Sequence, residues 1–573
     1  MTCALDQVSD ELLAHGFKYA PVLDSYPVMP AFIRVFASSL GEFTVHLPIS
    51  DPSLLKLPKP KLLSLPDELA GVRLPHLEGN QTICLFDEAT KNIDPLNPRA
   101  LIAACIEQLE QIIEGWAKGT SRLDIAAEFT SYWCFHKACY LYSSGSDSKL
   151  YSFDRKQLDE SIATEYLIAG SVSEALSWAL KRGFYPRGSI VNPSELCPVI
   201  RVSVKQPFYI PFDADWPLTT LGSFLAWLRL VDHNATANLV DKLRKEAKNR
   251  SHFFILLSHE TTYIGLQLTL ERAGKVALGV NLPKRKKLNL RQTFSTLTKH
   301  HCLSKFTRFL VEDATKEYIY QRNTTTFKGL QDMRICVIGC GTVGGYLSQS
   351  LVQSGAGVGR GVLCFYDADI LRTGNLGRHI LGTIYLDEKK SDAMAHYFQQ
   401  QGLAPNSRAA GEFTRTEIDK PWDLIVDATG EQGFSLMLTK WYHERNVATS
   451  RPNIIHSWVS GFGHQAKALI YTGEGACYAC QFNYNSSPRT DRYQSFSTKH
   501  AQGASQLFKR TCGESHLPFG PEASMIAAAL AMRLLKQEQE GEVNFLQKAI
   551  SPKARQYPEK NMSPMKNCPI CQN

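Results

Sequence analysis

An apolar strand that runs directly into a glycine-rich turn constrains the fold of this chain more than any other feature. Residues 333–338 read Met-Arg-Ile-Cys-Val-Ile, and Gly-Cys-Gly-Thr-Val-Gly follows at 339–344, ahead of a helical segment at 346–353. Glycines at this spacing allow a tight turn and let the backbone approach a phosphate group at the N-terminus of a helix. The sequence therefore predicts a nucleotide-binding unit whose three key glycines are Gly339, Gly341 and Gly344.

Two further apolar strands extend this unit into a sheet. They occupy 361–366 and 423–427; Asp367 follows the first, and Asp427 ends the second. The pattern is typical of a doubly wound, Rossmann-like α/β domain, which we assign to residues 321–573. Asp367 stands about twenty residues beyond the glycines, where a ribose-binding acid is expected. On these features alone, an NAD-dependent dehydrogenase remains an alternative.

The polar residues that come next favour a different chemistry. Five of them occur in a fixed order: Asp369, Asn375, Arg378, Lys390 and Asp427. The set resembles ubiquitin-activating enzymes of the ThiF/MoeB type, which implies nucleotide-binding roles for Asp369 and Asn375. Activation of a carboxylate by ATP places negative charge on the α-phosphate and on the departing pyrophosphate. The resemblance implies that Arg378 and Lys390 neutralise this charge and that Asp427 holds Mg²⁺; a dehydrogenase needs none of these.

A short segment upstream bears on oligomeric state. Residues 318–322 read Tyr-Ile-Tyr-Gln-Arg. They resemble the segment in which activating enzymes place an arginine that reaches the ATP of the other subunit. The resemblance implies a homodimer in which Arg322 has that role.

Two Cys-X-X-Cys pairs predict a metal site. Four thiolates suit a closed tetrahedral Zn²⁺ site that holds the C-terminal tail to its domain, whereas a redox motif needs only one pair. Among the 15 cysteines of the chain, we expect metal ligands and nucleophiles rather than disulfides. Bacterial enzymes resembling ThiF and MoeB carry such a site at the same places, which implies a structural zinc. Its ligands are Cys477, Cys480, Cys568 and Cys571.

Cys512 is the first candidate nucleophile. It stands in Lys-Arg-Thr-Cys-Gly-Glu-Ser at 509–515, after a polar stretch that begins at Asn485. The neighbouring Lys509 and Arg510 favour its thiolate form. The segment resembles the mobile loop that carries the thioester cysteine of activating enzymes, although a spare surface cysteine is the alternative. The remaining cysteines of this domain fall on or beside buried strands: Cys336, Cys340 and Cys364.

Cys84 is the second candidate nucleophile. It lies in Leu-Pro-His-Leu-Glu-Gly-Asn-Gln-Thr-Ile-Cys-Leu at 74–85, which resembles the active-site segment of ubiquitin-conjugating enzymes. The resemblance implies that Cys84 accepts an acyl group from Cys512 and passes it to an amine. The alternative is a buried structural cysteine.

The chain departs from the conjugating family at one position. Aligned back from the cysteine, the family's His-Pro-Asn becomes Leu74-Pro75-His76, so His76 replaces the asparagine that helps to stabilise the oxyanion. An imidazole N–H can donate the same hydrogen bond, or the ring can act as a base. A purely structural histidine remains the alternative.

The length of 573 residues predicts about three domains. We expect an α+β ubiquitin-conjugating-like domain over 1–125, with strands at 32–36 and 43–47 and a long amphipathic helix at 98–116. Residues 126–320 predict an α/β linker domain without a catalytic motif. Its expected elements are strands at 199–204 and 253–257, helices at 221–230 and 235–247, and an aromatic packing segment at 129–133.

Composition excludes several classes of protein. No apolar run reaches the roughly 18 residues that a membrane helix needs, and the N-terminus lacks the features of a signal peptide. We therefore expect a cytoplasmic protein without a membrane partner. The net charge of +8 is mild for this length, and the basic run at 284–287 is typical of a solvated loop, so no direct nucleic-acid contact is expected.

The order of these domains resembles the bacterial fusion enzyme of CBASS antiphage operons. The resemblance implies that the substrate is a protein with a free C-terminal glycine, a cGAS/DncV-like nucleotidyltransferase, which becomes joined to lysine amines of target proteins. The residues themselves support less: adenylation of some carboxylate, two thiol relays and an acyl acceptor. Activation of a ubiquitin-like or sulfur-carrier protein and a non-catalytic scaffold remain alternatives.

Overall fold

The computed structural model divides into two compact units. The first combines Met1–Leu176 with Pro186–Asp313, and the second combines Ser177–Tyr185 with Ala314–Asn573. Among the described residues, no helix is both long and apolar enough to cross a membrane. The structure describes residues 2–572 except 21–29, 52–53, 55, 71–73, 79, 87–93, 95, 120–128, 134–137, 144, 157–161, 183–196, 212–215, 281–288, 323–328, 446–450, 461–462, 486–488, 495–507, 512–513, 517–518, 538–542, 552–553 and 555–560.

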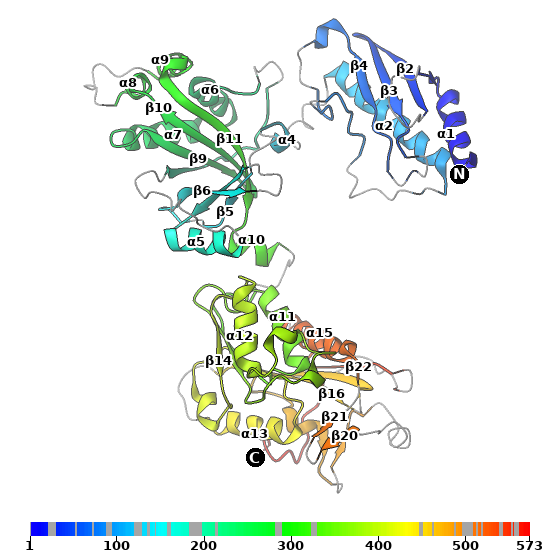
Figure 1. Ribbon diagram of the computed structural model, residues 1–573, viewed down its shortest axis with the longest axis vertical. Helices are drawn as coiled ribbons and strands as arrows, with labels where there is room; N and C mark the ends of the chain where they lie inside the picture. Colours follow the sequence, from blue (N-terminus) through cyan, green and yellow to red (C-terminus); the bar gives the residue numbers. More distant parts are fainter. Residues whose placement is uncertain are drawn as a thin grey trace. The chain divides into compact units, whose positions relative to one another are not determined.

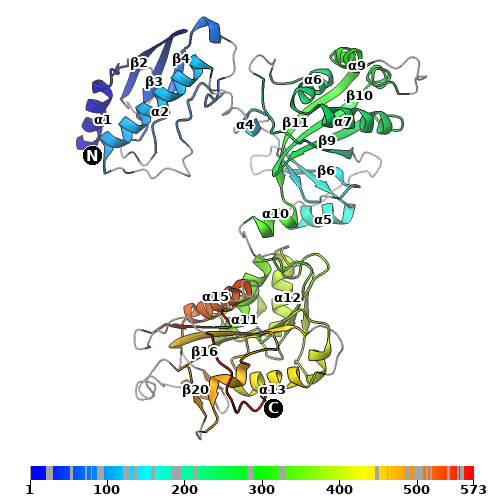
Figure 2. The same ribbon diagram turned by 180° about the vertical axis from the view of Figure 1, so that it is seen from behind.

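The N-terminal part of the first unit is a four-stranded antiparallel sheet packed against two helices (Figure 1). Its strands and helices include both strands and the long helix predicted from the sequence, which are therefore confirmed. Helix α2 lies across one face of the sheet (Figure 2). The elements are α1 (Thr2–Ala14), β1 (Lys18–Tyr19), β2 (Ala31–Ser38), β3 (Gly41–Pro48), β4 (Lys61–Ser64), η1 (Asp67–Leu69) and α2 (Pro98–Lys118).

Local sequence signals set the two ends of α2. The side chain of Asn97 caps the first turn by accepting a hydrogen bond from the backbone N–H of Ala100, and Pro98 occupies the first helical position. Gly119 ends the helix in the left-handed conformation at φ 65°. The apolar face of α2, from Ile102 to Trp116, is buried in one core with the sheet.

The second part of this unit is a closed seven-stranded barrel, with the strand order β10-β11-β5-β7-β6-β8-β9. The two predicted strands are present as β8 and β9, which pair in parallel. The closure of the barrel was not predicted, because the other five of its strands were not predicted from the sequence. The strands are β5 (Ala138–Leu141), β6 (Lys149–Lys156), β7 (Ile162–Ala169), β8 (Cys197–Ser203), β9 (His252–His259), β10 (Thr262–Leu270) and β11 (Leu303–Asp313).

Helices cover the barrel strands around an aromatic core. Phe129 and Trp133 lie with their ring centroids 5.6 and 5.8 Å from that of Trp227, which confirms the predicted packing role of the aromatic segment. The two predicted helices are also present. The helical elements are α4 (Phe129–Trp133), α5 (Val172–Lys181), α6 (Leu221–Val231), α7 (His233–Glu246), α8 (Arg272–Ala277), α9 (Leu290–Leu297) and η4 (His300–Cys302).

The second unit contains the predicted doubly wound sheet, in the order β14-β13-β12-β15-β16-β17-β22. The first five strands run parallel, β17 pairs antiparallel with β16, and β22 pairs antiparallel with β17. The strands are β12 (Arg334–Ile338), β13 (Val362–Tyr366), β14 (Ser407–Ala410), β15 (Leu424–Asp427), β16 (Asn453–Ser460), β17 (Gln465–Tyr471) and β22 (Phe545–Ala549).

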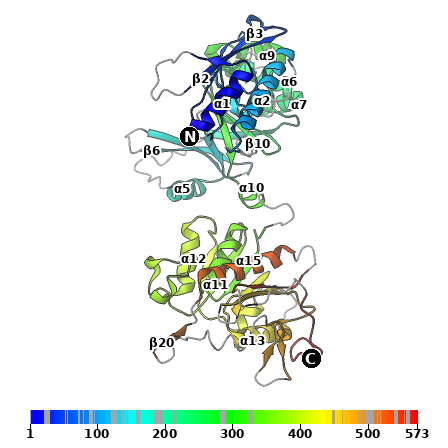
Figure 3. The same cartoon turned by 90° about the vertical axis from the view of Figure 1, so that its right-hand side faces the viewer.

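Helices pack on both faces of this sheet, and α11 and α15 lie side by side (Figure 3). Helix α11 begins at Thr342, four residues before the predicted start, so the glycine turn leads straight into it. The helices and turns are α10 (Lys316–Gln321), α11 (Thr342–Gln353), η5 (Thr373–Asn375), η6 (Thr383–Tyr385), α12 (Lys390–Gln400), η7 (Arg415–Asp419), α13 (Gln432–His443), η8 (Tyr478–Gln481) and α15 (Pro521–Gln537).

The strand order creates a topological switch point at the carboxyl ends of the central strands. The chain adds strands to one side of β12 as far as β14 and then returns to add β15 on the other side. Ligands of open α/β sheets bind at such a switch point, beyond the carboxyl ends of the strands. The glycine turn, Asp367 and Asp427 all follow or end strands at this edge.

Candidate functional site

The glycine turn is built so that three chain segments approach closely. Gly339 has φ +86°, and a Cβ atom there would lie 2.8 Å from the backbone of Thr429. A Cβ on Gly344 would lie 1.9 Å from the carbonyl oxygen of Gly339. By contrast, a Cβ placed on Gly341 would have no described atom within 4 Å beyond those of Gly341 and its two chain neighbours. The outer glycines therefore serve packing, and the middle one leaves the backbone open to a ligand.

Asp367 holds the glycine turn from the end of β13. One carboxylate oxygen accepts the backbone N–H of Cys340 at 2.7 Å, and the other accepts the N–H of Asp369 at 2.8 Å. A carboxylate offers about four lone-pair positions, so two remain for a ligand such as a ribose. Asp367 thus combines a structural role with the predicted binding role.

Lys390 lies beside the same turn. Its ammonium donates to the carboxylate of Asp369 at 2.8 Å, with 11% of the lysine side chain and 75% of the aspartate side chain exposed. The backbone N–H of Lys390 also donates to the carbonyl oxygen of Asp369 at 2.8 Å. The structure therefore brings together the predicted Asp367, Asp369 and Lys390.

Asp427 is placed differently from the prediction. Its carboxylate is buried and accepts hydrogen bonds from the backbone and hydroxyl of Thr429, the hydroxyl of Ser435 and Nδ1 of His456. Burial alone would raise the pKa of Asp427, but these hydrogen bonds and the nearby His456 lower it. Four donors use the four lone-pair positions of the carboxylate. The geometry therefore argues against Asp427 as a Mg²⁺ ligand and assigns it to holding the turn after β15.

Arg378 lies over an aromatic ring from a distant segment. Its guanidinium carbon is 4.5 Å from the centroid of Phe519, two residues before α15. Phe519 is itself fixed by Gly463, where a Cβ would lie 2.6 Å from that of Phe519. Burial lowers the pKa of Arg378, and a desolvated cation gains more from an aromatic face than an exposed one. The ring of Phe519 therefore orients the predicted phosphate-binding cation.

Replacing Phe519 by leucine is expected to weaken Mg·ATP binding several-fold, because a partly desolvated cation–π contact contributes about 0.5–2 kcal/mol. Phe519→Tyr keeps the aromatic face and is expected to bind as the wild type does. Isothermal titration calorimetry with Mg·ATP measures both. Equal affinity in the leucine and tyrosine variants would rule out the orienting role of the ring.

Three predicted residues of this domain remain: Asn375, Arg322 and Cys512. Asn375 accepts the backbone N–H of Arg372 at 2.9 Å through its side chain. Arg322 is exposed, with its guanidinium carbon 5.2 Å from the ring centroid of Tyr318. Cys512 falls in sequence between the paired strands β20 (Phe508–Thr511) and β21 (Glu514–His516) and lies outside the described residues.

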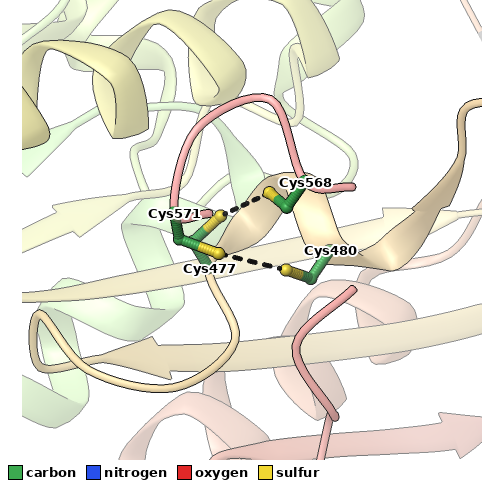
Figure 4. A group of neighbouring side chains, drawn as sticks. All are labelled: Cys477, Cys480, Cys568 and Cys571. Carbon is green, nitrogen blue, oxygen red and sulfur yellow. Dashed lines mark hydrogen bonds between the residues drawn. The ribbon is translucent and has the colours of Figure 1, made fainter. Parts of the chain in front are cut away.

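The four predicted zinc cysteines converge (Figure 4). Their sulfur atoms all lie within 4.8 Å of one another, with 3.6 Å between Cys477 and Cys568 and 3.5 Å between Cys480 and Cys571. A tetrahedral Zn²⁺ with bonds of about 2.3 Å separates its sulfur ligands by about 3.8 Å. The backbone N–H of Met565 also donates to the sulfur of Cys480 at 3.4 Å, as suits a thiolate. The cluster therefore fits zinc.

Cys84 is held on an exposed turn by the strands beneath it. Its backbone N–H donates to the carbonyl oxygen of His76 at 2.8 Å, and that of Ile83 donates to Pro60 at 2.8 Å. Ile83 and Leu85 point into the core while Cys84 between them is exposed. This alternation excludes the alternative of a buried structural cysteine and presents the thiol to solvent.

The backbone at His76 is shaped around this cysteine. His76 has φ 60°, a left-handed conformation that is uncommon for residues other than glycine, although histidine adopts it more often than most. Just before it, the carbonyl oxygen of Pro75 accepts a hydrogen bond from the indole N–H of Trp116 at 2.8 Å. The end of α2 thus anchors the turn that supports Cys84. A catalytic role for the half-buried His76 ring stays a prediction.

Replacing Trp116 by phenylalanine is expected to slow acyl transfer from Cys84 and to destabilise this domain by about 1–3 kcal/mol, because the buried Pro75 carbonyl loses its donor. A matched control is Trp227→Phe, which removes an equivalent 2.8 Å bond to Tyr209 in the barrel. Single-turnover discharge of the Cys84 thioester and thermal unfolding measure the two effects. Equal slowing in both variants would show a general loss of stability instead.

Sequence reasoning missed several residues that shape the site. Trp116 ends an amphipathic pattern and reads as core, and Phe519 carries no local signal. Only His379 could have been found from the sequence, because it directly follows Arg378 inside the predicted nucleotide-binding motif. It is 7% exposed and bonds the glycine turn.

Comparison with known families agrees with this geometry. A model of prokaryotic E2 family B matches residues 38–142, and a model of the ThiF family matches residues 319–572. The chain is a fusion of an E2-like domain and a ThiF-family domain. The E2-like match contains Cys84, and the ThiF match contains the glycine turn and the four-cysteine cluster.

Relatives align with this chain over most of their length. A protein of Vibrio cholerae serotype O1, named an ATP-dependent ubiquitin transferase-like protein Cap2, is 26% identical over 551 residues, covering 91% of each chain. A protein of the same name from Escherichia coli is 25% identical over 574 residues, covering 94% of this chain and 93% of the other.

Solved structures are similar to only part of this chain. The crystal structure of E. coli MccB with ATP is 15% identical and has a TM-score of 0.32, covering 56% of this chain and 99% of MccB. A second MccB structure, with AMPCPP and the peptide MccA, is 13% identical with a TM-score of 0.33, covering 56% of this chain and 97% of that one.

Proposed function

We propose that this fusion activates the C-terminal carboxylate of a protein with ATP and conjugates that protein to amines. The carboxylate attacks the α-phosphate and releases pyrophosphate, and the Cys512 thiolate then displaces AMP to form a thioester. The Cys84 thiolate displaces Cys512, and a target lysine amine finally displaces Cys84 to leave an amide. The observation that carries the proposal is the exposed, strand-anchored thiol of Cys84 on the same chain as an adenylation site.

The polar groups of the ThiF domain support the first step. Arg378 and Lys390 are two cations beside the glycine turn, where negative charge develops on the phosphates. Asp369 is a better candidate for Mg²⁺ than Asp427, because most of its side chain is exposed. Arg322 is proposed to reach the ATP of a second subunit in a homodimer.

The substrate is proposed to be a cGAS/DncV-like nucleotidyltransferase with a C-terminal glycine, in cytoplasmic antiphage defence of the CBASS type. The names of the relatives, which are ubiquitin transferase-like proteins, agree with protein conjugation in general. They also fit the alternative substrate, a ubiquitin-like protein in another pathway.

Intact-mass analysis tests the proposal. The wild type is incubated with Mg·ATP and either a cGAS/DncV-like nucleotidyltransferase from the same operon or a ubiquitin-like protein, without reductant. A reductant-sensitive adduct of nucleotidyltransferase mass, absent from Cys512→Ala, is expected. An adduct with the ubiquitin-like protein alone would keep the chemistry and overturn the substrate. No adduct with either, and no ATP-dependent pyrophosphate release, would refute the function.

A further inference from the structure

A buried histidine links the two segments that the proposed adenylation site depends on. His379 comes directly after Arg378, and its Nε2 lies 2.7 Å from the carbonyl oxygen of Cys340 in the glycine turn. Its Nδ1 lies 3.1 Å from the backbone nitrogen of Leu381. His379 is 7% exposed, so it makes these two contacts inside the domain. It thereby bridges the glycine turn and the segment that carries Arg378.

These contacts fix the protonation state of the ring. A backbone N–H can only donate, so Nδ1 accepts from Leu381 and carries no proton. Nε2 must then carry the proton, because a carbonyl oxygen such as that of Cys340 can only accept. The network thus selects one neutral tautomer, in which both ring nitrogens are used.

We propose that His379 is a positioning residue for nucleotide binding, which holds the glycine turn in register with Arg378 as a neutral hydrogen-bond bridge. The inference rests on the proposed adenylation function and extends it. The backbone of the turn must present its N–H groups to the phosphates while Arg378 meets them from the facing segment. A bridge from the residue next to Arg378 to the carbonyl of Cys340 sets the distance between these two partners.

The surroundings of His379 agree with a neutral ring. Burial is the largest influence and lowers its pKa from the ordinary 6.5; the hydrogen bond to Cys340 and the carboxylate of Asp367 raise it, and the cations of Lys390 and Arg378 lower it. A proton added at Nδ1 would face the N–H of Leu381 and break the bridge. The contribution of His379 is therefore complete above pH 6.5 and is lost as the pH falls through its lowered pKa.

Two substitutions separate positioning from mere packing. Glutamine places one N–H donor and one carbonyl acceptor at similar reach but does not titrate, whereas leucine fills space and makes neither bond. In His379→Gln, Mg·ATP affinity at pH 7.5 is expected to stay within about twofold of the wild type, and in His379→Leu it is expected to fall about tenfold. Isothermal titration calorimetry on the full chain with Mg·ATP gives both values, without any protein substrate.

The pH dependence supplies the second readout. Between pH 7.5 and pH 6.5, the wild type and His379→Gln are expected to lose Mg·ATP affinity equally, because the lowered pKa of His379 keeps its ring neutral over this range and protonation of ATP affects both proteins. A larger loss in the wild type, or wild-type affinity in a folded His379→Leu, would overturn the proposal. Should His379→Leu fail to fold by thermal unfolding, the glutamine comparison still decides. A wild type that binds no Mg·ATP would instead refute the adenylation function itself, and the proposal with it.

Discussion

Replacing Cys84 by alanine is expected to abolish amine conjugation, by at least about 10³-fold, while ATP-dependent thioester formation on Cys512 continues. A nucleophile that forms a covalent intermediate has no substitute once its sulfur is removed. The exposed position of Cys84 between two buried neighbours makes its thiol accessible to an incoming acyl group. Gel electrophoresis without reductant and intact-mass analysis measure the two steps separately.

Two variants make this test specific. Cys84→Ser is expected to accumulate an adduct that resists reductant, because an oxygen ester forms in place of the thioester. The matched control is Cys105→Ala, which removes a buried cysteine of helix α2 in the same domain. Conjugation at the wild-type rate in Cys84→Ala, or equal loss in Cys105→Ala, would remove Cys84 from the proposed relay.

Replacing Cys480 by serine is expected to release bound zinc and to destabilise the ThiF domain steeply. The wild type is expected to hold one zinc ion per chain, and structural zinc sites contribute roughly 10 kcal/mol or more to the folded state. The tail that carries Cys568 joins the domain core through this cluster, through the buried Met562, and through hydrogen bonds of Met562 with Asn544 and of Ser563 with Tyr493. Metal analysis by atomic emission and calorimetric unfolding check the prediction.

The loss of zinc is also expected to weaken the structure around the proposed nucleotide-binding site. Tyr478, between the first two zinc cysteines, lies with its ring centroid 4.6 Å from that of His456, and His456 bonds the carboxylate of Asp427. Cys364→Ala, on strand β13, serves as the control for losing a buried cysteine outside the cluster. A metal-free Cys480→Ser with the unfolding midpoint of the wild type would contradict the structural role of zinc.

Local sequence patterns predicted much of the fold. The apolar strand before the glycine turn, the amphipathic period of α2 and the paired Cys-X-X-Cys motifs each act over a few neighbouring residues, so the sequence displays them directly. The closed barrel was not visible in this way, because its closure depends on pairings such as β5 with β11, which lie far apart in the chain.

The functional site shows the same difference between features that the sequence displays and features that depend on the fold. Asp367 and the four cysteines were found because residue type and spacing reflect their chemistry, whereas Asp369 and Lys390 were found through the resemblance to activating enzymes. Asp427 was assigned from the same resemblance, but only the fold reveals that Thr429, Ser435 and His456 donate hydrogen bonds to its carboxylate.

What the sequence determined by itself was the glycine turn, the amphipathic helix α2 and the paired cysteines, because these follow from short-range spacing and side-chain chemistry. The two domain types followed from the resemblance of their motifs to known families. What the tertiary structure alone decided was the set of supports around them. Trp116 on the Cys84 turn, Phe519 on Arg378 and His379 on the glycine turn act through packing and hydrogen bonds between segments that no local pattern connects.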